Sequence, residues 1–167
     1  MQQRPAPPGI DVRRATDDDA QAIGAVFDAA VRAGWTYLGE LAQEPMFTSK
    51  DWDDLVANHA PPNVLLVATD AKNRVIGYAA AHPADGELFL LFVDPEFAGR
   101  GVGRRLLNAA HDALRAAGCT QGFLFVHEAN IRARAVYASA GYRPDGTIRD
   151  SDFRGASVRE VRLVTRL

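Results

Sequence analysis

One stretch of the chain, residues 88–107 with the sequence LFLLFVDPEFAGRGVGRRLL, constrains the fold more than any other. Its first six residues are all apolar, which predicts a buried strand at 88–93. Pro95 prevents that strand from continuing, because proline has no N–H to donate to a sheet ladder. An apolar helical pattern then runs from Leu106 to Leu114. A strand, a glycine-rich turn and a helix are therefore expected in direct succession.

Three glycines in this turn, at 99, 101 and 103, predict a site for an anion. A glycine-rich turn at a helix start presents unpaired backbone N–H groups in one concavity, and the helix dipole favours negative charge there. Glycine lets the backbone approach phosphate groups closely, because it has no Cβ. The usual ligand is a pyrophosphate, with the two arginine side chains of the turn either contacting it or staying solvated. The residues expected to form this site are Arg100, Gly101, Val102, Gly103 and Arg104.

Two common phosphate-binding patterns do not fit the turn. A Walker loop needs Gly-Lys-Ser or Gly-Lys-Thr, whereas Arg104 and Arg105 follow the last glycine here. A dinucleotide-binding fingerprint begins directly after its strand, whereas residues 94–98 separate the strand from the first glycine here. An ordinary tight turn is the alternative to a phosphate loop at this point.

The remaining pattern resembles the acyl-CoA pyrophosphate loop of the GNAT family (GCN5-related N-acetyltransferases). That loop reads Gln or Arg, two residues, Gly, one residue, and Gly or Ala. Gly101 and Gly103 occupy the last two places, but Ala98 stands at the first, which puts one side-chain contact in doubt. Because the family holds the phosphates mostly through backbone N–H groups, the resemblance still implies acetyl-CoA as the co-substrate.

A second segment, residues 123–142, strengthens the resemblance. It reads FLFVHEANIRARAVYASAGY and predicts a short strand, a turn and a helix over residues 131–140. The family pattern expects Asn, two residues, Ala, three residues and Tyr, followed by a Gly-Phe or Gly-Tyr close. This pattern is matched by Asn130, Ala133, Tyr137, Gly141 and Tyr142. With two motifs in the right order, the resemblance extends over nearly the whole chain.

The fold class that follows is α/β, a mixed α+β arrangement with a central mixed sheet flanked by helices, as in the GNAT acyl-CoA N-acyltransferase fold. Hydrophobic patterns predict strands at 10–14, 63–69, 74–82, 88–93, 123–126 and 158–167, and helices at 17–33, from about 49, through 106–114 and at 131–140. One more strand is expected between the last helix and the strand at 158–167. A helix joins the strands at 88–93 and 123–126, so they are expected to be parallel neighbours. The resemblance implies that these two strands splay apart and that the acyl-CoA lies between them. Its pantetheine would pair with backbone near Phe92 and Val93.

Length, charge and composition narrow the class of protein. The 167 residues suit one domain, expected at 10–167, after a proline-rich leader at 1–9 that is expected to be disordered. A net charge of −2 gives no electrostatic basis for binding nucleic acid or an anionic membrane. The lone Cys119 suits a reducing cytoplasm, and the four histidines lack metal-ligand spacing, so no metal is expected. An excess of Arg over Lys, with abundant Ala, is associated with GC-rich bacterial genomes.

Acyl transfer to an amine requires a group that takes a proton from the amine and a group that protonates the leaving thiolate. Glu87 is the candidate base, because it precedes Val93 by six residues, where several family members place a catalytic glutamate. The resemblance makes Tyr137 the candidate acid near the CoA sulfur, and the Val93 N–H the group that polarises the thioester carbonyl. The alternatives are a solvated carboxylate for Glu87 and a core tyrosine for Tyr137.

Three further residues are expected to contact ligands. Asn130 would hydrogen-bond the pantetheine by resemblance, and its alternative role is to cap the following helix. Trp35 and Tyr37 lie in the irregular segment where the family forms its acceptor pocket, and their alternative role is packing beneath that segment.

The predicted function is acetyl-CoA-dependent N-acetyl transfer to a primary amine of a small molecule or peptide. A non-catalytic acyl-CoA-binding sensor and an O-acyltransferase are the alternatives, and dimers are common in the fold, so a homodimer is one expected state.

Overall fold

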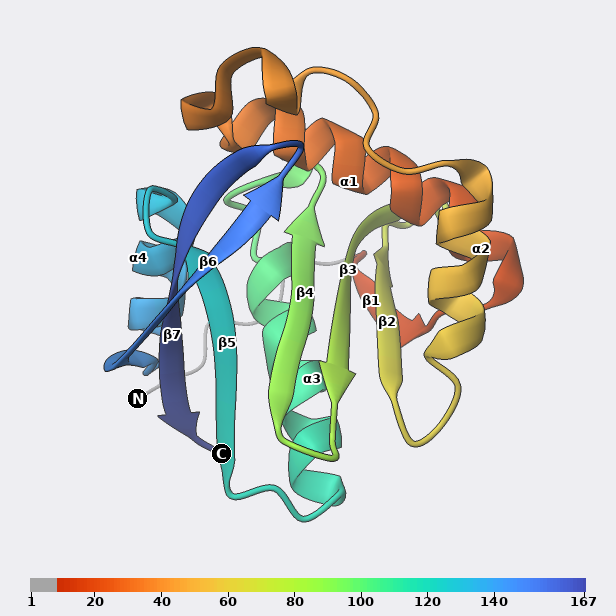
Figure 1. The fold of residues 1–167 in the computed structure, drawn as a ribbon. Helices are drawn as coiled ribbons and strands as arrows, with labels where there is room; N and C mark the ends of the chain where they lie inside the picture. The colour runs from red at the N-terminus through yellow and green to blue at the C-terminus, as the bar shows by residue number, and fades with distance from the viewer. Residues whose placement is uncertain (1–8) are drawn as a thin grey trace.

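A mixed sheet of seven strands forms the centre of the computed structural model, which describes residues 9–167 (Figure 1). The strands are β1 (Asp11–Arg14), β2 (Val64–Thr69), β3 (Val75–His82), β4 (Glu87–Val93), β5 (Gln121–His127), β6 (Arg143–Phe153) and β7 (Ala156–Arg166). Their order across the sheet is β1-β2-β3-β4-β5-β7-β6. The helices are α1 (Ala20–Gly34), α2 (Ser49–Asn58), α3 (Val102–Ala116) and α4 (Ile131–Ser139), with 3-10 turns η1 (Asp17–Asp19), η2 (Thr36–Ala42) and η3 (Pro95–Phe97). Residues 1–8 of the expected leader lie outside the described residues.

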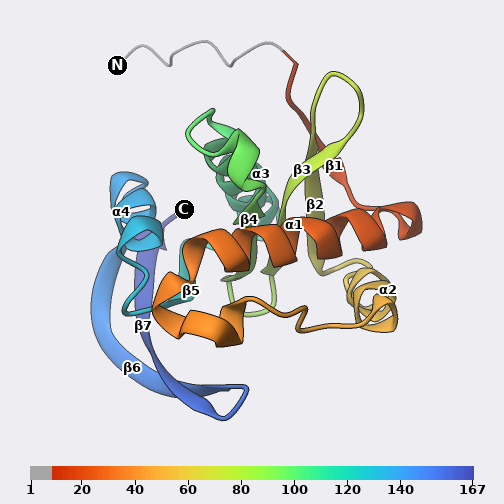
Figure 2. The same ribbon diagram turned by 90° about the horizontal axis from the view of Figure 1, so that it is seen from above.

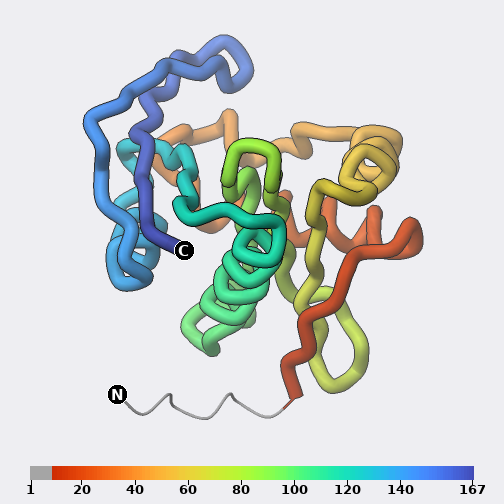
Figure 3. The backbone as a smooth tube through the Cα atoms, turned by 90° about the horizontal axis from the view of Figure 1, so that it is seen from below, coloured from red at the N-terminus to blue at the C-terminus, as the bar shows by residue number. Residues whose placement is uncertain are grey.

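Helices cover both faces of the sheet. Viewed from above and below, α1 and α2 lie on one face, and α3 and α4 lie on the other (Figure 2 and Figure 3). The apolar stripe predicted for α3 faces the sheet, and both Leu106 and Leu114 are fully buried. On the opposite face, Ile23 and Phe27 of α1 belong to the same buried cluster as Val67. Strand β2 is buried along its whole length, because helices cover both of its faces. Within residues 9–167, no helix combines the length and the apolar character needed to cross a membrane.

Strands β4 and β5 run parallel, as predicted, but they pair at one position only. Glu87 lies opposite Phe123, and beyond this pair the two strands share no register. β5 instead stays paired with β7 from Gln121 to His127, and β4 stays paired with β3 on its other side. The facing edges of β4 and β5 therefore carry backbone N–H and C=O groups that their mutual pairing does not use. The predicted splay of these strands is confirmed.

Two buried tyrosines differ in how their hydroxyls are satisfied. The Tyr142 hydroxyl lies 2.7 Å from His111 Nε2, whereas the Tyr78 hydroxyl has no hydrogen-bond partner among the described residues. Because an unsatisfied buried polar group costs about 1–3 kcal/mol, Tyr78→Phe is expected to leave the free energy of unfolding unchanged or to raise it. Tyr142→Phe is expected to lower it by about 1–2 kcal/mol. Urea unfolding of both variants measures this difference, and equal losses would contradict it.

Candidate active site

The predicted pyrophosphate loop connects β4 to the N-terminus of α3. Its first residue, Asp94, is fixed by a backbone N–H that donates to Ile76 O at 2.9 Å. Gly101 precedes α3 in the left-handed conformation, with φ of 85°, and has no side chain with which to cap the helix. The N–H of Arg105 donates to Gly101 O at 3.1 Å. The N–H groups of residues 102–104 come before this bond, so they point out of the helix N-terminus without a helical carbonyl as partner.

Glycine is required at position 101 by its backbone conformation. A Cβ built on Gly101 meets no protein atom within 4 Å, so the space at the helix N-terminus is open. Gly103 differs, because it lies inside α3 and its Cβ would make an ordinary contact at 3.5 Å with Val93 Cγ2. A side chain at position 101 would therefore occupy the space that an anion at the helix start needs.

The two loop arginines already have partners within the protein. The N–H of Arg100 donates to Phe97 O at 3.3 Å, and its guanidinium carbon lies 5.2 Å from the centre of the Phe97 ring. A guanidinium nitrogen of Arg104 lies 3.4 Å from Ser139 Oγ on α4. Because the Arg100 N–H is used, the backbone groups available for phosphate begin at Gly101.

A cavity of about 150 Å³ lies between the diverging ends of β4 and β5. Residues 88–92 line it from β4 and residues 124–127 line it from β5. Of the two residues predicted to meet the pantetheine, Phe92 lines the cavity, whereas Val93 packs beside the start of α3. The remaining lining residues are Trp35, Asn130, Ala133, Tyr137 and Glu160.

Two residues of the second motif reach the cavity from the start and the inner face of α4. The side-chain oxygen of Asn130 accepts the N–H of Ala133 at 3.1 Å, so Asn130 caps the helix and also lines the cavity. Tyr137 is buried, and this burial raises the pKa of its hydroxyl well above the ordinary value. The Tyr137 hydroxyl therefore stays protonated at neutral pH.

The two aromatic residues predicted for the acceptor pocket have different positions. Trp35 lines the cavity, and its ring lies 4.3 Å from the His127 ring and 6.1 Å from the Phe92 ring. Tyr37 is not among the lining residues, but its hydroxyl lies 2.8 Å from His127 Nδ1. Tyr37 therefore supports a residue of the cavity wall and does not itself form the wall.

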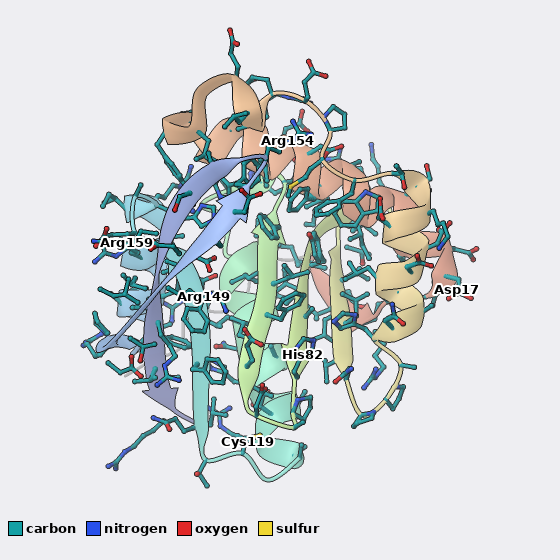
Figure 4. The ribbon with its side chains drawn as sticks, viewed as in Figure 1. Asp17, His82, Cys119, Arg149, Arg154 and Arg159 are labelled. Atoms are coloured by element: carbon teal, nitrogen blue, oxygen red, sulfur yellow. The ribbon has the colours of Figure 1, made fainter. Side chains whose placement is uncertain are left out.

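His127 and Glu160 are cavity residues that the sequence analysis missed. They are direct partners in the β5–β7 pair, and His127 Nε2 lies 3.9 Å from Glu160 Oε1. The second oxygen of Glu160 accepts from Arg149 Nε at 2.6 Å, and Figure 4 shows Arg149 on β6 beside β5. Burial lowers the pKa of His127, although the charge of Glu160 opposes this effect, so the ring is neutral at neutral pH. The sequence did contain a signal for this pair. His127 is a polar residue at the end of an apolar strand, and Glu160 lies within the alternating final strand.

Glu87 lies at the closed end of the cleft. It pairs with Phe123 on β5 and with His82 on β3, and its Oε2 atom is 3.6 Å from His82 Nδ1 (Figure 4 labels His82). Leu88 lines the cavity, whereas Glu87 does not. The structure therefore places Glu87 next to the cavity wall and not in it.

The loop and the cavity together suit a ligand with an anionic group and an extended chain. The helix N-terminus offers N–H groups to the anion, and the unpaired edge of β4 offers hydrogen bonds to the chain. Tyr137 offers a proton, and the His127–Glu160 pair offers acceptors. Within residues 9–167, no cluster of three or more His, Cys, Asp or Glu side chains is placed to hold a metal ion.

Comparison with known sequences identifies the family. The model of the acetyltransferase (GNAT) family matches residues 27–142, which is more than half of the chain. A mycothiol acetyltransferase from Clavibacter michiganensis subsp. michiganensis is 33% identical over 144 residues, which cover 84% of this chain and 45% of that relative. The chain thus spans less than half the length of this relative. It belongs to the GNAT family of acetyltransferases.

Comparison with solved structures shows the same fold. A GCN5-related N-acetyltransferase from Rhodopseudomonas palustris aligns with a TM-score of 0.81 at 21% identity, covering 99% of this chain and 100% of that one. The YncA protein from Salmonella typhimurium, solved with its cofactor acetyl-CoA, aligns with a TM-score of 0.74 at 17% identity, covering 95% and 94%. The predicted family and fold class are thereby confirmed.

Proposed function

We propose that the protein transfers the acetyl group of acetyl-CoA to a primary amine of a small molecule or peptide. The observation that carries this proposal is the open helix N-terminus at Gly101, which follows β4, together with the cavity between β4 and β5 that Tyr137 lines. Membership of the GNAT family and the YncA structure with its cofactor acetyl-CoA support the choice of co-substrate. The acceptor of the mycothiol acetyltransferases is not carried over, because the chain covers 45% of the relative compared.

The residues present fit an acyl-CoA. The N–H groups of residues 101–104 would hold the pyrophosphate, and the side chains of Arg100 and Arg104 would add positive charge there. The unpaired edge of β4 near Phe92 and Val93 would hydrogen-bond the pantetheine, with Asn130 on the opposite wall of the cavity. Bound in this way, acetyl-CoA supplies the acetyl thioester.

Three groups of the chain would serve the transfer. The backbone N–H of Val93 would polarise the thioester carbonyl, which makes its carbon more electrophilic. Glu87 would take a proton from the amine by way of water, because the lone pair of the nitrogen must be free to form the C–N bond. Tyr137 would donate its proton to the sulfur as the C–S bond breaks, so that CoA leaves as a neutral thiol. The surplus proton that the nitrogen carries after the C–N bond forms would return to the Tyr137 oxygen.

Glu87→Gln is expected to lower kcat at neutral pH by at least about tenfold and to recover in part at alkaline pH. An alkylamine has a pKa of about 10, so at neutral pH it arrives protonated and needs a base, whereas at high pH solvent removes that proton. Affinity for CoA is expected to stay unchanged. A pH–rate profile that overlays that of the parent would remove Glu87 from the mechanism.

The proposed function is tested by following thiol release from acetyl-CoA with spermidine, trialanine and free lysine as acceptors. Thiol release with an acetylated amine product by mass spectrometry supports the proposal. Tight binding of acetyl-CoA without release under any condition would favour the acyl-CoA sensor. Release with a hydroxyl acceptor, giving a product cleaved by mild hydroxylamine, would favour the O-acyltransferase.

The cellular setting belongs to the same proposal. We place the protein in a bacterial cytoplasm on the basis of its lone Cys119, and the relative compared above is also bacterial. A homodimer stays a prediction, and light scattering of the purified protein tests it.

A further inference from the structure

The wall of the cavity carries a carboxylate and an imidazole that the proposed transfer has not used. Glu160 and His127 are both nearly buried, with side chains 13% and 9% exposed, and both line the cavity. We propose that Glu160 Oε1 and His127 Nε2 bind the acceptor ammonium, so that the acceptor class is a cationic alkylamine. This inference rests on the proposed function, because it names the acceptor class for the same site.

The pair lies at the level of the cleft where the two strands have separated. Beyond the Glu87–Phe123 pair the two strands diverge, and His127 is the last residue of β5. Both His127 and Leu91 line the cavity. An amine held by His127 therefore lies in the same cavity as Leu91 and Phe92 of β4, near which the pantetheine is proposed to bind.

The spacing of the two acceptor atoms suits an ammonium group. His127 Nε2 and Glu160 Oε1 are 3.9 Å apart, which is too long for a hydrogen bond between them. If a nitrogen atom lies about 2.8 Å from each acceptor atom, the acceptor–nitrogen–acceptor angle is about 90°. Two N–H bonds of a tetrahedral ammonium can form hydrogen bonds at this angle with only a modest departure from linearity. One ammonium can therefore donate to both atoms at once.

Glu160 is oriented so that its carboxylate can accept a hydrogen bond from a cation. Its Oε2 atom accepts from Arg149, whose side chain is half exposed, so water screens the charge of that guanidinium. The Oε1 atom lies 3.9 Å from His127 Nε2, and Glu160 lines the cavity. Arg149 is in turn fixed over the Phe125 ring, with its guanidinium carbon 3.6 Å from the ring centre. The carboxylate is thus held in one orientation by one of its oxygens and is free to bind through the other.

His127 can accept a hydrogen bond as a neutral imidazole. The groups that face it are the Tyr37 hydroxyl from η2, Glu160 from β7 and the Trp35 ring. Burial and the charge of Glu160 raise the pKa of Tyr37, so its hydroxyl stays protonated and can still accept an N–H from His127 Nδ1. In that tautomer Nε2 carries a lone pair and can accept an N–H. The nearby Trp35 ring adds a π face, which also favours a cation.

The test measures how the amine binds to the CoA-loaded protein, where no turnover can occur. Calorimetry with spermidine, and with trialanine as a second probe, is run on the parent, Glu160→Gln and Tyr37→Phe. Glu160→Gln is expected to weaken amine binding by about 10- to 100-fold, since it removes a charge-assisted hydrogen bond. Tyr37→Phe, which keeps the ring and releases His127, is expected to weaken it by a smaller factor. Glu128→Gln is the matched control, because Glu128 is exposed next to His127 and loses the same charge without lining the cavity.

The outcomes separate this inference from the proposed function. Weaker amine binding in Glu160→Gln, with unchanged affinity for CoA and with Glu128→Gln like the parent, supports the inference, since a merely structural defect would change CoA binding too. If the parent binds amine through Glu160 but releases no thiol from acetyl-CoA, the proposed function fails and the ammonium site stands. Equal amine affinity in the parent and Glu160→Gln, or no amine binding by the parent, would overturn the inference even if turnover is observed.

Discussion

Gly101→Val is expected to weaken CoA binding by at least about 100-fold while the chain still folds. The β-branched side chain would enter the open space at the N-terminus of α3 and would separate the pyrophosphate from the N–H groups of residues 102–104. Loss of two charge-assisted hydrogen bonds is enough for this effect, because each contributes about 1.5–3 kcal/mol. Calorimetric titration with CoA measures the affinity.

Gly99→Val is the matched control for this experiment. Gly99 also has a positive φ, of 76°, and its Cβ would likewise meet no atom within 4 Å. The backbone strain is therefore comparable, but Gly99 does not adjoin the helix N-terminus. Gly99→Val is expected to lose a similar amount of stability and to keep much more of its CoA affinity. Unchanged CoA affinity in a folded Gly101→Val variant would remove this loop from the binding site.

Tyr137→Phe is expected to keep CoA binding and to lower kcat by about 10²–10⁴-fold, the range typical of general acid–base catalysis. The substitution removes the proton donor of the cavity and leaves the ring that packs 5.7 Å from the Tyr142 ring. Steady-state kinetics with the amine found in the thiol-release assay measure the effect. A variant with full kcat would make Tyr137 a packing residue only.

Tyr142→Phe is the control that separates loss of stability from loss of the proton donor. Its hydroxyl is hydrogen-bonded to His111 and does not line the cavity. It is therefore expected to unfold at lower urea concentration than the parent while its folded fraction retains the parental kcat. The two phenylalanine variants should thus show opposite combinations of stability and turnover.

Much of the fold was predictable because its decisive elements carry strong local patterns. The apolar run before Pro95 and the glycines after it predicted β4, the loop and α3 in the order that the structure shows. The helix connection between β4 and β5 predicted their parallel direction, which the Glu87–Phe123 pair confirms. These patterns depend on neighbours in the sequence, so they are visible without any tertiary information.

Strand β6 was harder to place, because its environment is set by a distant partner. Residues 143–153 read RPDGTIRDSDF and lack apolar alternation, since most of the strand is exposed and its pairing with β7 is irregular between Pro144 and Ile148. The His127–Glu160 pair was not predicted for the same reason, because the two residues lie on strands that are far apart in the sequence and adjacent only in the sheet. Nor was the role of Tyr37 predicted, which follows from a contact across ninety residues of sequence.

A crystal structure of the protein with acetyl-CoA tests the proposed binding mode most directly. We expect the pyrophosphate at the N–H groups that follow Gly101 and the pantetheine in the cavity between β4 and β5, with its sulfur near the Tyr137 hydroxyl. An acetyl-CoA molecule bound elsewhere, with β4 and β5 still separated around an empty cavity, would contradict the central claim.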